Sequence, residues 1–211
     1  MGSINYVETI EPTIKKDCKM KVLILNASPR RNGLISQMLD IMQEHLVAAG
    51  ASVESINVND LTIRPCAGCM VCRSKDHCVL PEDDSQRVLR IMQESERIIV
   101  GAPCYWGNLP GQLKLMFDRM VYGMMKDTRY FPAPLMKGKK AVVVSTCTTQ
   151  WPWNIVYRQT RGVVNAMREI FGYSGIKIVA NVQRGGTHFG NKQLTDRDRN
   201  KCIKAAKKLL K

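Results

Sequence analysis

Four cysteines lie close together in the sequence and are candidate ligands of a metal site. Cys66, Cys69 and Cys72 follow one another at intervals of three residues, and Cys78 follows after a longer gap. Thiolates at such short spacing can hold an iron–sulfur cluster or zinc. Zinc sites usually pair two Cys-x-x-Cys units across a longer gap, so the spacing favours a [4Fe–4S] cluster. A loop with free thiols is the second interpretation, and zinc is the third.

A second segment, 28–36 (SPRRNGLIS), has residues suited to binding a phosphate. It links an apolar run to a helical pattern, and backbone N–H groups at a helix start attract anions. Ser28 and Ser36 can donate hydroxyl hydrogen bonds, Arg30 or Arg31 can neutralise charge, and Gly33 permits a tight turn. The segment lacks the Walker and GxGxxG patterns, and a polar turn that caps a helix would explain it equally well.

A third segment, 103–111 (PCYWGNLPG), combines aromatic residues with turn residues. Tyr105 and Trp106 could provide a flat apolar surface for a flavin ring, while Gly107 and Asn108 could provide polar groups along its edge. The alternative is a helix N-terminus anchored by aromatics, with Cys104 as a small buried residue.

Hydrophobic patterns predict the elements that would position these segments. Short apolar runs at 20–27, 52–58, 97–102, 140–145 and 176–182 predict strands, and helical periodicity separates them. Strands alternating with helices indicate an α/β fold with a five-stranded parallel sheet covered on both faces. Ligands of such sheets bind at the carboxyl ends of the strands, so we expect the site in the loops after the first, third and fourth strands.

The length, hydropathy and net charge of the chain limit the classes of protein to which it can belong. The 211 residues predict one domain over 20–211, with a cysteine-rich loop at 64–82 and an N-terminal extension at 1–19. No apolar run reaches the length of a membrane span, and residues 1–19 lack the order of a secretory signal, so we expect a cytoplasmic protein without membrane contact. The net charge of +14 attracts anions, but the basic residues are dispersed and no nucleic-acid-binding motif is present.

The segments SPRRNG…S and PCYWGNLPGQLKLMFDR resemble the flavodoxin-like NAD(P)H-dependent FMN reductase family, and the cysteines resemble its iron–sulfur flavoprotein branch. The resemblance implies a flavodoxin-like three-layer sandwich. It also implies that the first loop holds the FMN phosphate, that the loop after the third strand holds the isoalloxazine ring, and that the loop after the fourth strand completes the pocket. The implied residues are Ser28, Arg30, Asn32, Gly33 and Ser36 for the phosphate, Pro103, Tyr105, Trp106, Gly107 and Asn108 for the ring, and Thr146, Cys147 and Thr148 for the pocket.

The function implied is electron transfer from NAD(P)H through FMN to a flavin, a quinone or another acceptor, with a possible [4Fe–4S] cluster on the route. The alternative is an electron-transfer flavoprotein without a dedicated substrate, which accepts electrons from a ferredoxin-like carrier. No side chain is identified as a catalytic acid or base, because hydride transfer needs alignment more than proton transfer. The Met-rich helix expected at 109–125 and the aromatic residues near the expected site predict a homodimer or homotetramer, but a buried core would explain them equally well.

Overall fold

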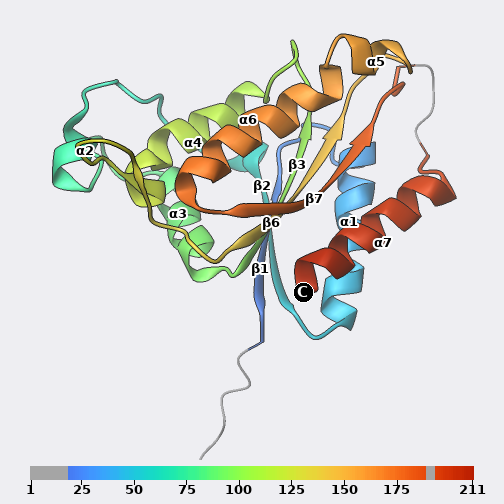
Figure 1. Cartoon of the computed structure of the whole chain (residues 1–211), viewed down its shortest axis with the longest axis horizontal. Helices are drawn as coiled ribbons and strands as arrows, with labels where there is room; N and C mark the ends of the chain where they lie inside the picture. The colour runs from blue at the N-terminus through green and yellow to red at the C-terminus, as the bar shows by residue number, and fades with distance from the viewer. Residues whose placement is uncertain (1–18, 189–192) are drawn as a thin grey trace, which may run out of the picture.

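The computed structural model describes residues 19–188 and 193–211, so Cys18 lies outside the described residues. Five parallel strands form one sheet in the order β2-β1-β3-β6-β7 (Figure 1). The predicted five-stranded parallel sheet is therefore confirmed. Its strands are β1 (Lys21–Asn26), β2 (Ser52–Asn57), β3 (Arg97–Pro103), β6 (Lys140–Thr146) and β7 (Lys177–Arg184).

Helices cover both faces of this sheet, which gives the predicted three layers (Figure 1). α1 (Leu34–Ala48) and α7 (Asp196–Leu210) pack together on one face. α3 (Asp84–Glu94), α4 (Gly111–Met124) and α6 (Gln159–Ser174) cover the other face. Each face has its own cluster of buried apolar side chains, as expected of a sheet whose strands contact helices on both sides.

The central strands are buried because their sequences are nearly continuous runs of apolar residues. In β1 the four residues after Lys21 are buried, and β3 and β6 are buried over most of their lengths. The register pairs Asn26 with Gly101 and Pro103 with Thr146, so β1, β3 and β6 end close to one edge of the sheet. The loops that follow these strands are thereby brought together.

Several short elements are absent from the sequence-based prediction. They are η1 (Val58–Asp60), α2 (Val71–Lys75), α5 (Trp153–Val156), and a hairpin of β4 (Met125–Lys126) with β5 (Ala133–Pro134). Such elements are too short to establish a hydrophobic period, so their sequences resemble loops.

The C-terminal helix α7 has an exposed basic face that carries Lys201, Lys204 and Lys208. Cys202 is fully buried on its opposite face, and Arg184 Nη1 of β7 forms an ion pair of 2.7 Å with Asp198 Oδ2. The helix α7 and the edge strand β7 are thus held together by apolar packing and by this ion pair. Over the described ranges, no helix combines the length and the apolar character needed to cross a bilayer.

Candidate functional site: a pocket at the carboxyl ends of the strands

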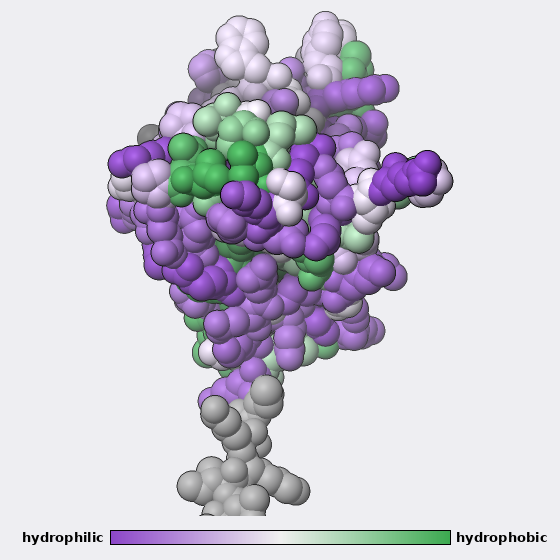
Figure 2. Space-filling view, turned by 90° about the vertical axis from the view of Figure 1, so that its left-hand side faces the viewer, coloured by the Kyte–Doolittle hydropathy of each residue, from purple (hydrophilic) through white to green (hydrophobic). Residues whose placement is uncertain are grey.

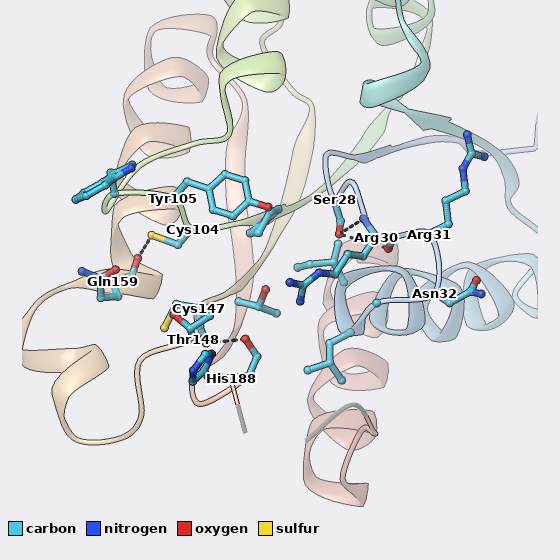
Figure 3. Close-up of a pocket in the computed structure, with 17 residues that line it drawn as sticks. Ser28, Arg30, Arg31, Asn32, Cys104, Tyr105, Cys147, Thr148, Gln159 and His188 are labelled. Atoms are coloured by element: carbon cyan, nitrogen blue, oxygen red, sulfur yellow. Dashed lines mark hydrogen bonds between the residues drawn. The ribbon is translucent and has the colours of Figure 1, made fainter. Parts of the chain in front are cut away.

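Loops after β1, β3, β6 and β7 surround one pocket of about 760 Å³ (Figure 3). This volume lies in the range of about 300–1,000 Å³ that is typical of ligand sites. We call it the strand-end pocket. Ten of the residues implied by the resemblance line it, namely Ser28, Arg30, Asn32, Gly33, Pro103, Tyr105, Trp106, Thr146, Cys147 and Thr148.

The N-terminus of α1 opens into this pocket without a cap. Gly33, the N-cap residue, provides no side-chain hydrogen bond, and the first turn of α1 contains no acidic residue. The first N–H groups of a helix have no partner within the helix, and the helix dipole makes this end positive. The lining residues Gly33, Leu34 and Ile35 belong to this terminus, which is therefore suited to an anion.

Hydrogen bonds hold the loop before α1 in shape. The Ser28 hydroxyl accepts from the Arg30 N–H at 3.3 Å, and the Ser36 hydroxyl donates to the Arg30 carbonyl at 3.2 Å. Ser36 also accepts from Asn26 Nδ2 at 3.0 Å, and it does not line the pocket. Ser36 therefore fixes the loop from behind, while Ser28 lies at the pocket surface.

The two arginines of this loop point in different directions. In Figure 3 the Arg30 side chain extends into the pocket, whereas Arg31 and Asn32 extend away from it. Arg31 Nη2 forms an exposed ion pair with Asp60 Oδ1 at 2.7 Å. The sequence alone does not decide whether Arg30 or Arg31 neutralises an anion. In the structure, Arg30 is the one whose side chain is placed to do so in the pocket.

The loop after β3 makes a tight turn beside the pocket. Tyr105 and Asn108 exchange two backbone hydrogen bonds, of 3.1 and 2.9 Å, and the residues between them have positive φ angles, 51° at Trp106 and 72° at Gly107. The Asn108 side chain accepts from the Leu109 N–H at 2.8 Å. Gly107 and Asn108 do not line the pocket, so in this structure they shape the turn.

Within this turn, Tyr105 points into the pocket (Figure 3). It lies across the gap from Ser28 and Arg30, and about half of its surface is exposed. Trp106 is fully exposed at the tip of the turn. The pocket thus has a charged end at the loop before α1 and an aromatic end at the loop after β3.

Helix α6 supports the aromatic loop. A Cβ atom placed on Gly162 would lie 1.7 Å from the Gly107 carbonyl oxygen, so only glycine allows this contact. The Cys104 thiol donates to the Gln159 carbonyl, and the Cys104 N–H donates to the Thr146 carbonyl at 2.7 Å. Gln159 consequently lines the pocket, although the sequence between the fourth and fifth strands gave no signal for it.

Two thiols, those of Cys104 and Cys147, lie in the pocket wall. Burial raises the pKa of each thiol above its ordinary value. Both thiols are therefore protonated at neutral pH, and neither is activated as a nucleophile.

The loop after β7 closes the remaining side of the pocket. Thr187 donates to the Cys147 carbonyl from its N–H at 3.2 Å and from its hydroxyl at 3.0 Å. His188 lines the pocket beside it. Neither residue was among the implied site residues, but the rule that ligands bind where parallel strands end also covers the loop after β7.

The four clustered cysteines lie apart from this pocket, in the cysteine loop, by which we mean residues 64–82. Cys66 and Cys69 are exposed, and Cys72 and Cys78 are partly buried. Burial, followed by the nearby thiols of Cys78, Cys66 and Cys69, raises the pKa of Cys72. The thiols are thus neighbours, yet among the described residues no three metal-binding side chains are arranged around one point.

A buried ion pair fixes the base of the cysteine loop. Arg119 Nη1 lies 2.9 Å from Asp83 Oδ2, with the arginine side chain fully buried and the aspartate side chain 9% exposed. Arg119 also donates to the carbonyls of Arg64 at 3.0 Å and Pro81 at 3.4 Å, which are the two ends of the loop. Arg119 of α4 therefore holds the ends of the loop together.

The loop also carries exposed apolar side chains. Met70 and Val79 each expose about half of their surface. Figure 2 shows the side of the molecule that carries α2, where an apolar patch is surrounded by hydrophilic surface. Exposed apolar side chains thus lie in the same loop as the four thiols.

Comparisons with known proteins agree with this geometry. An iron-sulfur flavoprotein of Archaeoglobus fulgidus is 34% identical over 120 residues, covering 57% of this chain and 51% of that protein. One of Methanosarcina thermophila is 33% identical over 102 residues, covering 48% and 53%. The chain thus spans about half the length of the curated relatives it matches.

Solved structures share the fold at low sequence identity. An FMN-dependent NADH-azoreductase of Bacillus anthracis, solved in complex with FMN, superposes with a TM-score of 0.71 at 16% identity, covering 91% of this chain and 100% of that chain. The family model described as NADPH-dependent FMN reductase matches residues 20–186. The chain belongs to the NADPH-dependent FMN reductase family.

Proposed function

We propose that the protein is an FMN-dependent oxidoreductase that takes electrons from NAD(P)H. The observation that carries this proposal is the pairing, in one pocket, of the uncapped α1 terminus with Arg30 at one end and Tyr105 at the other. The charged end suits the phosphate of FMN, and the aromatic end suits its flat tricyclic ring. Membership of the FMN reductase family supports the same assignment.

The residues present fit FMN. We assign the phosphate to the loop of Ser28, Arg30, Asn32 and Gly33, with Ser36 supporting it, because this loop carries a positive charge and leads into the uncapped first turn of α1. We assign the ring to the loop from Pro103 to Asn108, with the segment from Thr146 to Thr148 on the adjoining wall.

FMN supplies the redox chemistry when it is bound: two electrons enter as a hydride from a reduced nicotinamide and leave to an acceptor. The protein's part is to hold the ring and to leave one face open to the nicotinamide. The two wall thiols are protonated, so we assign no acid, base or nucleophile among the side chains. The acceptor is proposed to be a quinone, a free flavin or another small oxidant.

For the cysteine loop we propose a [4Fe–4S] cluster, supported by the four thiols and by the printed name of the relatives. The described arrangement does not gather three ligands, so the loop would have to close around a cluster. Anaerobic purification followed by iron, sulfide and zinc analysis tests this. Equal iron and sulfide near four per chain support it, whereas full flavin without iron, or zinc alone, contradicts it.

A homodimer or homotetramer is proposed from the exposed aromatic residues beside the pocket. Trp151, Trp153 and Tyr157 are 77%, 54% and 64% exposed, and Ile155 and Val156 lie among them. Exposed apolar groups of this size are typical of interaction surfaces. Light scattering should give a multiple of the 23.8 kDa chain mass, and Trp153→Ser should shift the protein toward monomer.

The test of function is anaerobic reduction of the flavin-loaded protein. NADPH or NADH should bleach the oxidised-flavin absorbance, and a quinone should then restore it with continuous turnover. The second candidate, an electron carrier, is favoured by the net charge of +14, which suits an acidic ferredoxin-like donor. Bleaching by reduced ferredoxin but by neither nicotinamide would overturn the proposed enzyme activity and support the carrier.

A further inference from the structure

A second pocket lies on the outer side of α6, close to the first. Its volume is about 390 Å³, and three arginines contribute to its lining. These are Arg158, Arg161 and Arg168, which we call the arginine row. Arg161 and Arg168 lie on α6 about 10 Å apart at the helical rise of 1.5 Å per residue, and Arg158 is the N-cap residue directly before the helix.

The charges of the arginine row are not neutralised within the described part of the chain. No ion pair found there includes any of the three, and all three are exposed. Arg168 Nη1 makes one hydrogen bond, of 3.4 Å, to the Asn165 side chain. Three guanidinium groups with neither carboxylate partner nor burial are available to a ligand that carries several negative charges.

The helix terminus adds to this positive potential. α6 begins at Gln159, its N-cap residue Arg158 makes no side-chain cap, and its first turn contains no acidic residue. The positive end of the helix dipole therefore lies next to the first arginine of the row. Arg158 has a φ of 53°, a backbone conformation that a non-glycine residue adopts rarely.

The linings of the two pockets include neighbouring residues at the start of α6. Gln159 lines the strand-end pocket, while its neighbour Arg158 lines the second pocket. The wall between them is fixed, because the Thr160 hydroxyl donates to Gln183 Oε1 at 2.8 Å and the Ser145 hydroxyl donates to the Thr160 carbonyl at 3.1 Å. A long ligand that leaves the strand-end pocket past Gln159 would therefore meet Arg158, the first arginine of the row.

We propose that the arginine row binds the phosphates of NADPH, with Arg158 and Arg161 on the pyrophosphate and Arg168 on the adenosine 2′-phosphate. This rests on the proposed function, which places the nicotinamide over the strand-end pocket and leaves the adenosine half outside it. NADPH carries negative charge at two places along its length, and the row offers positive charge at two corresponding places. The row therefore selects NADPH over NADH.

Steady-state kinetics of the FMN-loaded protein test the proposal with both nucleotides. Arg168→Ser should lower kcat/KM for NADPH about tenfold or more and leave NADH unchanged, because only NADPH carries the 2′-phosphate that Arg168 binds. Arg158→Asn should lower kcat/KM for both nucleotides, since both carry the pyrophosphate. The matched control is Arg199→Ser, which removes an exposed arginine from α7 on the other face of the sheet.

A binding measurement separates this inference from the proposed function. Adenosine 2′,5′-bisphosphate should bind the wild-type FMN-loaded protein in calorimetry and bind Arg168→Ser about tenfold more weakly or worse, whereas 5′-AMP should not distinguish Arg168→Ser from wild type. If neither nucleotide is oxidised but the bisphosphate binds in this way, the arginine site stands and the enzyme activity fails. Equal bisphosphate binding by wild type and variants would overturn the site. So would arginine variants that are reduced normally by NADPH and slowly only by an acidic carrier protein.

Discussion

Replacing Arg119 with methionine would leave Asp83 buried without its cationic partner. Arg119 is fully buried and Asp83 nearly so, and their charged atoms lie 2.9 Å apart. Removing one partner of a buried ion pair typically costs about 3–5 kcal/mol, because the other charge remains out of water. Asp83 keeps hydrogen bonds from the Ser85 N–H at 2.9 Å, the Ser85 hydroxyl at 2.6 Å and the Arg64 N–H at 3.0 Å. We therefore expect Arg119→Met to lose about 3 kcal/mol, at the lower end of that range.

Urea unfolding followed by circular dichroism measures this loss. Arg119→Met should lower the midpoint without changing the slope, which reports the surface exposed on unfolding. The double variant Asp83→Asn/Arg119→Met should lose less than the sum of the single variants, because it removes both charges. The control is Arg90→Met, which breaks an exposed ion pair with Glu82 of 2.5 Å and should cost at most about 1 kcal/mol.

Two results would refute this reasoning. One is an Arg119→Met protein whose unfolding free energy lies within about 1 kcal/mol of wild type, the range of an exposed ion pair. The other is strict additivity of the two single variants, which would mean that Arg119 and Asp83 do not stabilise one another.

Three further predictions follow from the same geometry. Gly162→Ala should displace the turn at Gly107, because the added Cβ atom would lie 1.7 Å from the Gly107 carbonyl oxygen. Flavin titration should then show weaker FMN binding, and an unchanged affinity would contradict the role of this contact. Burial opposes the ionisation of Asp83, but hydrogen bonds from Ser85 and Arg64 and the charge of Arg119 together lower its pKa. The ionised Asp83 therefore stabilises the fold above its unfolded pKa of about 3.9, and this stabilisation is lost as the pH falls through the lower folded pKa. Unfolding measured from neutral to acidic pH should show this loss in wild type and not in Asp83→Asn, and parallel profiles would contradict it. Trp106→Gly should raise the unfolding free energy by about 1 kcal/mol by relieving the positive φ of 51°, as measured by urea unfolding, and no change or a loss would show that Trp106 stabilises the turn.

The sheet and its main helices could be predicted because their patterns are local and repeated. The strands around Leu23, Ile99 and Val143 are continuous apolar runs, and the intervening helices show a clear period. The order of the strands places the loops after β1 and β3 side by side, so Ser28, Arg30 and Tyr105 meet as expected.

Other features depend on contacts between segments that are distant in sequence. Gln159 reaches the pocket only because Gly162 allows α6 to approach Gly107, and no pattern within either segment indicates that contact. The difference between Arg30 and Arg31 depends on Asp60, which lies in a different loop. Arg119 could be assigned no role from the sequence, because its partners come from both ends of the cysteine loop.

The central claim is that the strand-end pocket binds FMN by its phosphate as well as by its ring, and a comparison of FMN with riboflavin tests it most directly. Titration by quenching of flavin fluorescence should show that wild type binds FMN about tenfold or more tightly than riboflavin, which has the same ring without the phosphate. Arg30→Ala should remove much of this difference, whereas Arg31→Ala, whose side chain pairs with Asp60 outside the pocket, should preserve it. Equal affinity for the two flavins in wild type, or no detectable binding of either, would contradict the account.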